Sequence, residues 1–382
     1  MPPEVVGRLA LNRALLARQH LLRRAALPSG DGRPGQVLAM VEQLAGLQAQ
    51  APFPPYFGLW SRLAGFRPGD LAELILDRRV VRLALMRGTI HLVCARDGLA
   101  MRPLVQPVLD RGFQAGFARQ LGGVDLAQLA AAGRVLVEET PRTFSELGAL
   151  LAGRWPAHPP AALAQGVRAL VPLVQVPPRA VWGKAGQARH TSAEAWLGPR
   201  PDELDAGEAA PGLDWLVRRY LAAFGPATVA DVQAWSGLTR LREVTERLRP
   251  ALRTFRDSRG RELFDLPDAP RPEPDTPAPV RLVAEFDNLV LSHQDRSRII
   301  SDQDRQRLFT RNGIFPGTVL VAGFAAGIWR ISRAAGAATV IVELFGPVTD
   351  TDRENIIREG ERMLTFAAPA ARSRDLRFAD LT

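Results

Sequence analysis

The sequence predicts an α+β fold in which three repeated units precede a smaller β-rich unit. An order of helices followed by a β-hairpin occurs three times between residues 5 and 266. After a proline-rich segment at residues 267–279, short apolar β-runs separated by turns replace the helical spacing. The chain of 382 residues is long enough for more than one hydrophobic core.

The first unit contains helices followed by a hairpin. Residues 80–93 hold two β-runs around Arg87-Gly88, which predicts a β-hairpin. This order is that of a winged helix, the variant of the helix-turn-helix in which the hairpin forms the wing. Helical spacing of apolar residues, with a proline tolerated in one first turn, predicts the helices at residues 5–24, 37–47, 56–63 and 68–77.

The same order recurs twice. Thr143 and Thr228 are each followed three residues later by an acid, Glu146 and Asp231, which predicts capping boxes at two helix starts. We therefore predict an internal repeat of the winged-helix order. The second copy has helices at residues 143–153 and 160–170 and a β-like stretch at 171–191, and the third has helices at 212–224, 228–237 and 238–248 and a hairpin at 252–266.

The last unit is predicted to be a small antiparallel sheet or barrel with a closing helix at residues 350–366. Its β-runs lie at residues 280–285, 317–321, 323–329 and 339–344. The predicted domains are three winged helices at residues 1–125, 126–200 and 201–270 and a β-barrel-like domain at 271–382.

Charge and cysteine content narrow the classes of function. The net charge is +9 and nearly all the cations are arginine, which favours a polyanionic partner, nucleic acid before membrane. A GC-rich genome would also enrich arginine without any functional meaning. No apolar run is long enough to span a bilayer, and we expect no signal peptide. The single cysteine, Cys94, excludes an internal disulfide and fits a cytoplasmic protein.

A pair of glutamines is the candidate for chemistry. Gln48-Ala49-Gln50 follows a predicted helix and precedes three prolines, where no helix continues. In an extended backbone, the two amides would project to the same side roughly 7 Å apart, at about 3.3 Å rise per residue. Amides both accept and donate hydrogen bonds, so the pair could hold one water. The alternative is two solvated loop glutamines.

Other polar residues allow two interpretations each. The stretch at 287–298 either contacts phosphates through Arg296 and Arg298 or is a hydrogen-bonded loop with a structural role. Arg87 in the first wing and Arg259 in the third suit phosphate or groove contacts, with a solvated wing tip as the alternative. No phosphate-binding glycine loop, nucleophile elbow or metal-ligand spacing is found, so we do not expect a metalloenzyme.

Four segments carry a resemblance to a known family: LAGLQAQ at 44–50, LMRGTIHLV at 85–93, EFDNLVLSHQDRSRII at 285–300 and GTVLVAGFAAGIWR at 317–330. Together they resemble the winged-helix DNA glycosylases of the AlkZ/YcaQ type, which excise bulky alkylated and crosslinked purines. The resemblance implies three tandem winged helices and a C-terminal β-barrel around a C-shaped DNA-binding channel.

The family resemblance also implies a mechanism. One branch carries the motif Gln, apolar residue, Gln and the other carries Asp in the third position. Gln48 and Gln50 match the first, AlkZ branch, which is associated with self-resistance to DNA-alkylating natural products. An N7-alkylated guanine is cationic and leaves as a neutral base, so the glutamines would only orient a water through their carbonyl oxygens. No metal or cofactor is required.

The implied partner is double-stranded DNA carrying alkylated purines, bound by a monomer. Arg87 and His91 on the first wing, and Lys184 and Arg189 in the strand pair around residues 181–189, would probe the groove beside the lesion. The alternative is a non-catalytic winged-helix protein, either a transcription regulator or a drug-sequestering resistance protein. Regulators usually bind paired half-sites as dimers, and the sequence suggests no dimerisation helix.

Overall fold

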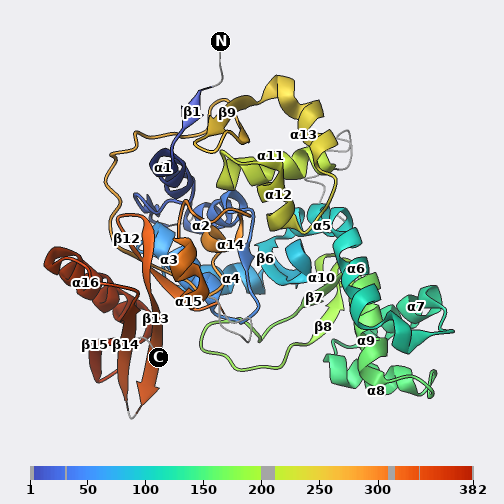
Figure 1. The fold of residues 1–382 in the computed structure, drawn as a ribbon. Coiled ribbons are helices and arrows are strands. Elements are labelled where there is room, and N and C mark those ends of the chain that lie inside the picture. The colour runs from blue at the N-terminus through green and yellow to red at the C-terminus, as the bar shows by residue number, and fades with distance from the viewer. Residues whose placement is uncertain (1–3, 31, 199–210, 309–314, 335, 381–382) are drawn as a thin grey trace.

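The computed structural model describes residues 4–30, 32–198, 211–308, 315–334 and 336–380. It mixes helices and β-sheets, which confirms the predicted α+β class. Figure 1 shows the C-terminal strands and α16 (Asp350–Ala367) on one side of the molecule and helices from its middle on the other. The N-terminal helices lie between these two sides, and the helices within residues 213–248 lie toward the top of the view (Figure 1).

The first part of the chain forms helices that precede a β-hairpin, as predicted. The hairpin pairs β5 (Val80–Ala84) with β6 (Ile90–Cys94) in antiparallel register. The first helix is shorter than the predicted residues 5–24, because Val5 and Val6 pair with a later strand and His20, two residues beyond its end, has a left-handed φ of 52°. The elements before the hairpin are α1 (Arg8–Arg18), β2 (Ala25–Ala26), α2 (Gly32–Gln43), β3 (Leu47–Gln48), α3 (Pro54–Arg62), β4 (Leu63–Ala64) and α4 (Pro68–Leu76).

The middle part contains more helix than the sequence predicted. The capping box at Thr143 is confirmed: its Oγ1 accepts the Glu146 N–H, and Glu146 Oε2 accepts the Thr143 N–H. The predicted β-stretch at 171–191 forms strands only at its two ends, which extend the first hairpin into a sheet of order β3-β6-β5-β7-β8. The elements are α5 (Ala95–Leu104), α6 (Gln106–Gly116), α7 (Leu126–Glu139), α8 (Phe144–Ala152), α9 (Pro160–Leu170), β7 (Leu173–Gln175), β8 (His190–Ser192) and α10 (Ala193–Leu197).

The third part repeats the order of helices and hairpin. Thr228 caps its second helix, and Asp231 Oδ2 accepts the Thr228 N–H at 2.9 Å, which confirms the second predicted capping box. The N-terminal strand β1 (Val5–Val6) adds to the hairpin of this part in parallel, with Val5 paired to Arg256 and Val6 to Asp257. The elements are α11 (Leu213–Phe224), α12 (Val229–Ser236), α13 (Arg242–Leu248), β9 (Arg253–Asp257) and β10 (Glu262–Asp265).

The C-terminal part is an open sheet in the order β11-β12-β13-β14-β15. The first four strands are antiparallel, whereas β15 pairs in parallel with β14 because α16 crosses over between them. The elements are β11 (Arg281–Val283), α14 (Asn288–Leu291), α15 (Asp302–Leu308), β12 (Gly317–Val321), β13 (Phe324–Ala334), β14 (Ala337–Leu344), α16 and β15 (Ser373–Ala379).

This sheet does not confirm the expected barrel. In the described residues β11 and β15 are edge strands that do not pair with each other, so the sheet is not closed. The number of winged-helix domains and their boundaries stay predictions, and the boundary placed at residue 200 lies outside the described residues.

Buried polar contacts join the N-terminal part and the third part to the segment that follows β11. Arg62 at the end of α3 donates from both terminal nitrogens to the two carboxylate oxygens of Asp287, each at 2.9 Å. Tyr220 on α11 donates its hydroxyl to the carbonyl of Ser292 at 2.8 Å. The side chains of Arg62 and Asp287 are at most 5% exposed, so their ion pair fixes the loop against α3.

Candidate functional site

Gln48 lies in strand β3 and its side chain is 8% exposed. The strand pairs antiparallel with β6, which places Gln48 opposite His91. Gln48 Oε1 accepts a hydrogen bond from Arg87 Nη2 at 2.7 Å. A guanidinium only donates, so this contact fixes the amide with its oxygen toward Arg87. The second lone pair of that oxygen and the two N–H donors remain for a ligand.

Arg87 connects three parts of the chain. It lies in the turn η1 (Met86–Gly88) with a φ of 58°, a left-handed conformation that few non-glycine residues adopt. Besides Gln48, its guanidinium donates to the Trp235 carbonyl at 2.7 Å and to Asn288 Oδ1 at 2.9 Å. Burial, and then the charge of Arg296, lowers the pKa of Arg87 to about 10, which leaves it cationic at neutral pH. The guanidinium therefore works as an internal tie here, a role that the sequence did not predict.

The backbone of the motif is held as firmly as Gln48. Ala49 is fully buried, its N–H donates to the Ile90 carbonyl at 2.7 Å, and its carbonyl accepts from Arg82 at 2.7 Å. Gln50 is exposed, and its Oε1 accepts the Ile90 N–H at 3.3 Å. Both glutamines thus lie beside strand β6, but Gln48 is buried and Gln50 faces solvent.

Two pockets adjoin the motif. Gln48 lines a narrow one with a volume of about 10 Å³, which is close to the room that one water requires. The second has a volume of about 200 Å³. Residues 51–54, which come directly after Gln50 in the sequence, form one of its walls. Phe53, Phe57 and Trp329 give this second pocket an aromatic lining.

His91 is enclosed, whereas the resemblance implied that it would probe the DNA groove. Its side chain has no exposed area, and its Nδ1 lies 3.2 Å from the Thr89 carbonyl oxygen. Burial, and then the charge of Arg87, lowers the pKa of His91 to about 3, so the ring is neutral at physiological pH. His91 and the tied guanidinium of Arg87 could reach a DNA groove only after a rearrangement of the wing.

Lys184 and Arg189 lie in the loop between β7 and β8, and they differ in their contacts. Lys184 is exposed. Arg189 donates to both carboxylate oxygens of Glu146, at 2.7 and 2.9 Å, and so binds the capping box of α8. The loop packs against the aromatic pocket, because the Trp182 and Phe53 rings are 5.5 Å apart and the Tyr56 hydroxyl donates to the Ala180 carbonyl at 2.7 Å. Of these two cations, Lys184 is therefore the one available to a ligand.

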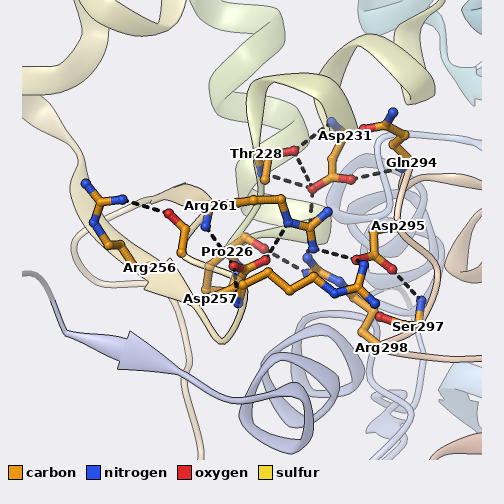
Figure 2. Close-up of polar contacts among 12 residues, drawn as sticks. Pro226, Thr228, Asp231, Arg256, Asp257, Arg261, Gln294, Asp295, Ser297 and Arg298 are labelled. Carbon is orange, nitrogen blue, oxygen red and sulfur yellow. Dashed lines mark hydrogen bonds and ion pairs between the residues drawn. The ribbon is translucent and has the colours of Figure 1, made fainter.

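Arg259 and Arg298 lie in one polar cluster with Arg261, Asp257 and Asp295. Figure 2 shows Arg261 between Asp257 and Asp295, with nitrogen to oxygen distances of 2.7 and 2.5 Å. Arg259, at the tip of the β9–β10 hairpin, is 63% exposed and lies 3.3 Å from Asp295. Its exposure leaves this guanidinium accessible to a phosphate.

Arg298 and Arg296 make internal contacts. Arg298 is 5% exposed and donates to the Pro226 carbonyl at 2.8 Å (Figure 2). Arg296 donates from Nε to the His293 carbonyl at 3.3 Å, and burial lowers its pKa to about 10. The neighbouring Gln294 N–H donates to Asp231 Oδ1 at 2.9 Å (Figure 2). Of the two roles left open for this stretch, these contacts favour the structural one.

Among the described residues, no helix has both the length and the apolar character needed to cross a membrane.

Comparisons with known proteins give a family for the chain and a similar fold among solved structures. The family model described as DNA glycosylase AlkZ-like matches residues 41–366. No match is found among curated protein sequences. Among solved structures, the fold is similar to that of the Streptomyces sahachiroi DNA glycosylase AlkZ, with a TM-score of 0.77 and 17% sequence identity. The match covers 98% of this chain and 100% of that chain.

Proposed function

The chain belongs to the AlkZ-like DNA glycosylase family, and from that premise we propose that it hydrolyses the N-glycosidic bond of N7-alkylated purines in double-stranded DNA. The reaction leaves an abasic site. The observation that carries the proposal is the segment Gln48–Gln50, whose first glutamine is oriented by Arg87 beside a pocket of one-water size.

The chemistry needs positioning more than acid catalysis. Alkylation at N7 makes the purine cationic, so the electron pair of the breaking C1′–N9 bond neutralises the leaving base. A water attacks C1′, and the two glutamines orient it. Arg87 already uses one lone pair of the Gln48 oxygen, so Gln48 binds the water through the other lone pair or through an amide N–H. Arg87 is therefore a positioning residue.

We extend the substrate class to bulky purine adducts, including crosslinks. The aromatic pocket that follows Gln50 supports this extension, because its Phe53, Phe57 and Trp329 rings offer an apolar surface next to the motif. Adducts of this kind form when DNA-alkylating natural products react with the cell that makes them. Self-resistance to such a product is accordingly the cellular role that we propose.

Lys184 and Arg259 are the two predicted DNA contacts that we retain. Both side chains are exposed, and a duplex held by them would be anchored at points outside the two pockets. Contacts of this kind fix the register of the protein on the phosphate backbone and carry no sequence information. Excision at damaged sites of any sequence is compatible with such binding.

Base release from defined duplexes tests the proposed function. Wild-type protein is incubated with three duplexes that carry guanine, N7-methylguanine or a bulky N7-alkylguanine at one position, and alkali-labile strand cleavage reports the abasic site. We expect cleavage at the alkylated positions and none at guanine. Binding to all three duplexes without cleavage would contradict the proposal and would favour the non-catalytic winged-helix protein.

A further inference from the structure

Glu285 lies in the loop between β11 and α14, where the two pockets beside the motif meet. It lines the narrow pocket together with Gln48, and it also lines the aromatic pocket together with Phe57. Pro54 is the one other residue common to both linings in the described part of the chain. A ligand that occupied both pockets would therefore pass Glu285.

The two carboxylates of this loop differ in their contacts. Asp287 receives both terminal nitrogens of Arg62 at 2.9 Å, and its Oδ1 also accepts the Leu289 N–H at 2.9 Å. Glu285 is half-buried, and within the described residues its carboxylate has no hydrogen-bond or ion-pair partner. Asp287 is committed to holding the loop, whereas Glu285 remains available.

An unpartnered, half-buried carboxylate needs an explanation. Burial without a partner costs free energy, and this burial raises the pKa of Glu285 above its ordinary value. Folding gains nothing from such a group, since an apolar or amide side chain would be easier to bury. Groups of this kind beside a pocket are candidates for chemistry.

The proposed reaction lacks a proton acceptor. When water attacks C1′, a C–O bond forms and the C1′–N9 bond breaks, with its electron pair moving to N9 of the cationic purine. One proton must leave the attacking water. The neutral amides of Gln48 and Gln50 can orient this water but are too weakly basic to take its proton, whereas a carboxylate can.

We propose that Glu285 is a catalytic residue that accepts the proton of the attacking water, while its negative charge stabilises the oxocarbenium-like transition state. The proton then passes to solvent as the abasic product leaves. This inference rests on the proposed glycosylase function. It adds a base to a motif that contains only neutral amides.

The charged groups around Glu285 determine which titration the pH dependence of the excision rate would report. The charged residues that line the pockets with it are Arg62 from α3, Asp287 from its own loop and Arg333 from β13. Arg62 and Asp287 neutralise each other. Arg333 is exposed and donates to the Ala367 carbonyl at 3.3 Å. Arginines stay cationic through the acidic range, so a titration in this range would come from a carboxylate, and Glu285→Gln separates Glu285 from Asp287.

Single-turnover excision between pH 4.5 and 8 tests the inference on a duplex with one N7-alkylguanine. The wild-type rate is expected to rise with pH as Glu285 deprotonates and then to level off. Glu285→Gln is expected to be about 100-fold slower and to lose this pH dependence. Glu285→Asp should restore part of the rate. The matched control is Glu361→Gln, the same change at an exposed residue of α16, which should behave as wild type.

Folding and DNA binding are measured on the same variants. Because an amide is easier to bury than an unpartnered carboxylate, the melting temperature of Glu285→Gln should equal or exceed that of wild type, with duplex affinity unchanged. If wild type releases the base and Glu285→Gln keeps the wild-type rate and pH profile, the inference is wrong and the proposed function stands. Absence of release by the wild type would overturn the proposed function, and the inference with it.

Discussion

Replacing Arg87 by alanine tests whether the hydrogen bonds of its guanidinium orient Gln48. The change removes the donor to Gln48 Oε1, to Asn288 Oδ1 and to the Trp235 carbonyl. The side chains of Gln48 and Asn288 are 8% and 5% exposed, so both oxygens would be left buried without this donor. At roughly 1–3 kcal/mol for each unsatisfied buried acceptor, the free energy of unfolding should fall by roughly 2–6 kcal/mol.

The same substitution should impair base release. Without Arg87, the Gln48 amide can rotate and present either end to the pocket, so the water would be oriented only part of the time. Arg87→Lys keeps the charge but not the planar fork that reaches several acceptors, and we expect its excision rate to fall about tenfold, or about 1.4 kcal/mol. Urea unfolding and single-turnover excision give the two quantities.

Arg259→Ala serves as the control for the stability measurement. Arg259 is 63% exposed, so its removal should change the free energy of unfolding by less than about 0.5 kcal/mol. If Arg87→Ala matched Arg259→Ala in stability and matched wild type in excision rate, the tie would have no role in holding Gln48.

Three further predictions concern pH, salt and substrate size. The pKa of His91 is lowered to about 3 in the folded state, below its ordinary 6.5. The unfolded state therefore binds a proton first, and stability should decline as pH falls from 6.5. His91→Phe should reduce the slope of the free energy of unfolding against pH. Arg259→Ala should reduce the slope of log affinity against log salt for duplex binding by about 1. Arg298 is buried, so Arg298→Ala should lower stability instead. Equal slopes for wild type and Arg259→Ala would remove Arg259 from the DNA contacts. Phe53→Ala should slow excision of a bulky adduct more than that of N7-methylguanine, and an equal effect on both rates would argue against the aromatic pocket as the adduct site.

The elements with strong local signals are those that the sequence predicted well. The threonine caps at 143 and 228 and the hairpin over residues 80–93 depend on neighbouring residues, and all three are present. Helix α7 was missed although Asp125 caps it and accepts the N–H groups of Ala127 and Gln128, which is a local signal that could have located it. Strand β15 was also missed, although Leu376 and Phe378 alternate with the charged Asp375 and Arg377 and are its two partly buried positions, which is a short local signal for a strand.

Long-range pairing explains the remaining differences. Whether the C-terminal sheet closes depends on contact between its first and last strands, and the pattern of β-runs contains no information about that contact. Arg87 donates to Gln48 and Asn288, which are separated from it by 39 and 201 positions in the sequence. Neither partner could therefore be identified from spacing. The same holds for Glu285, whose position between two pockets appears only once β11 lies beside α3.

Single-turnover excision by the Gln48→Ala/Gln50→Ala double variant tests the catalytic pair most directly. The variant is compared with wild type and with Gln114→Ala/Gln303→Ala, which alters two exposed glutamines, on one duplex with a bulky N7-alkylguanine. Mass spectrometry identifies the released base. We predict release by wild type and the control and none by the motif variant, with duplex binding equal in all three. Release of the alkylated base by the motif variant at the wild-type rate would contradict the assignment of Gln48 and Gln50.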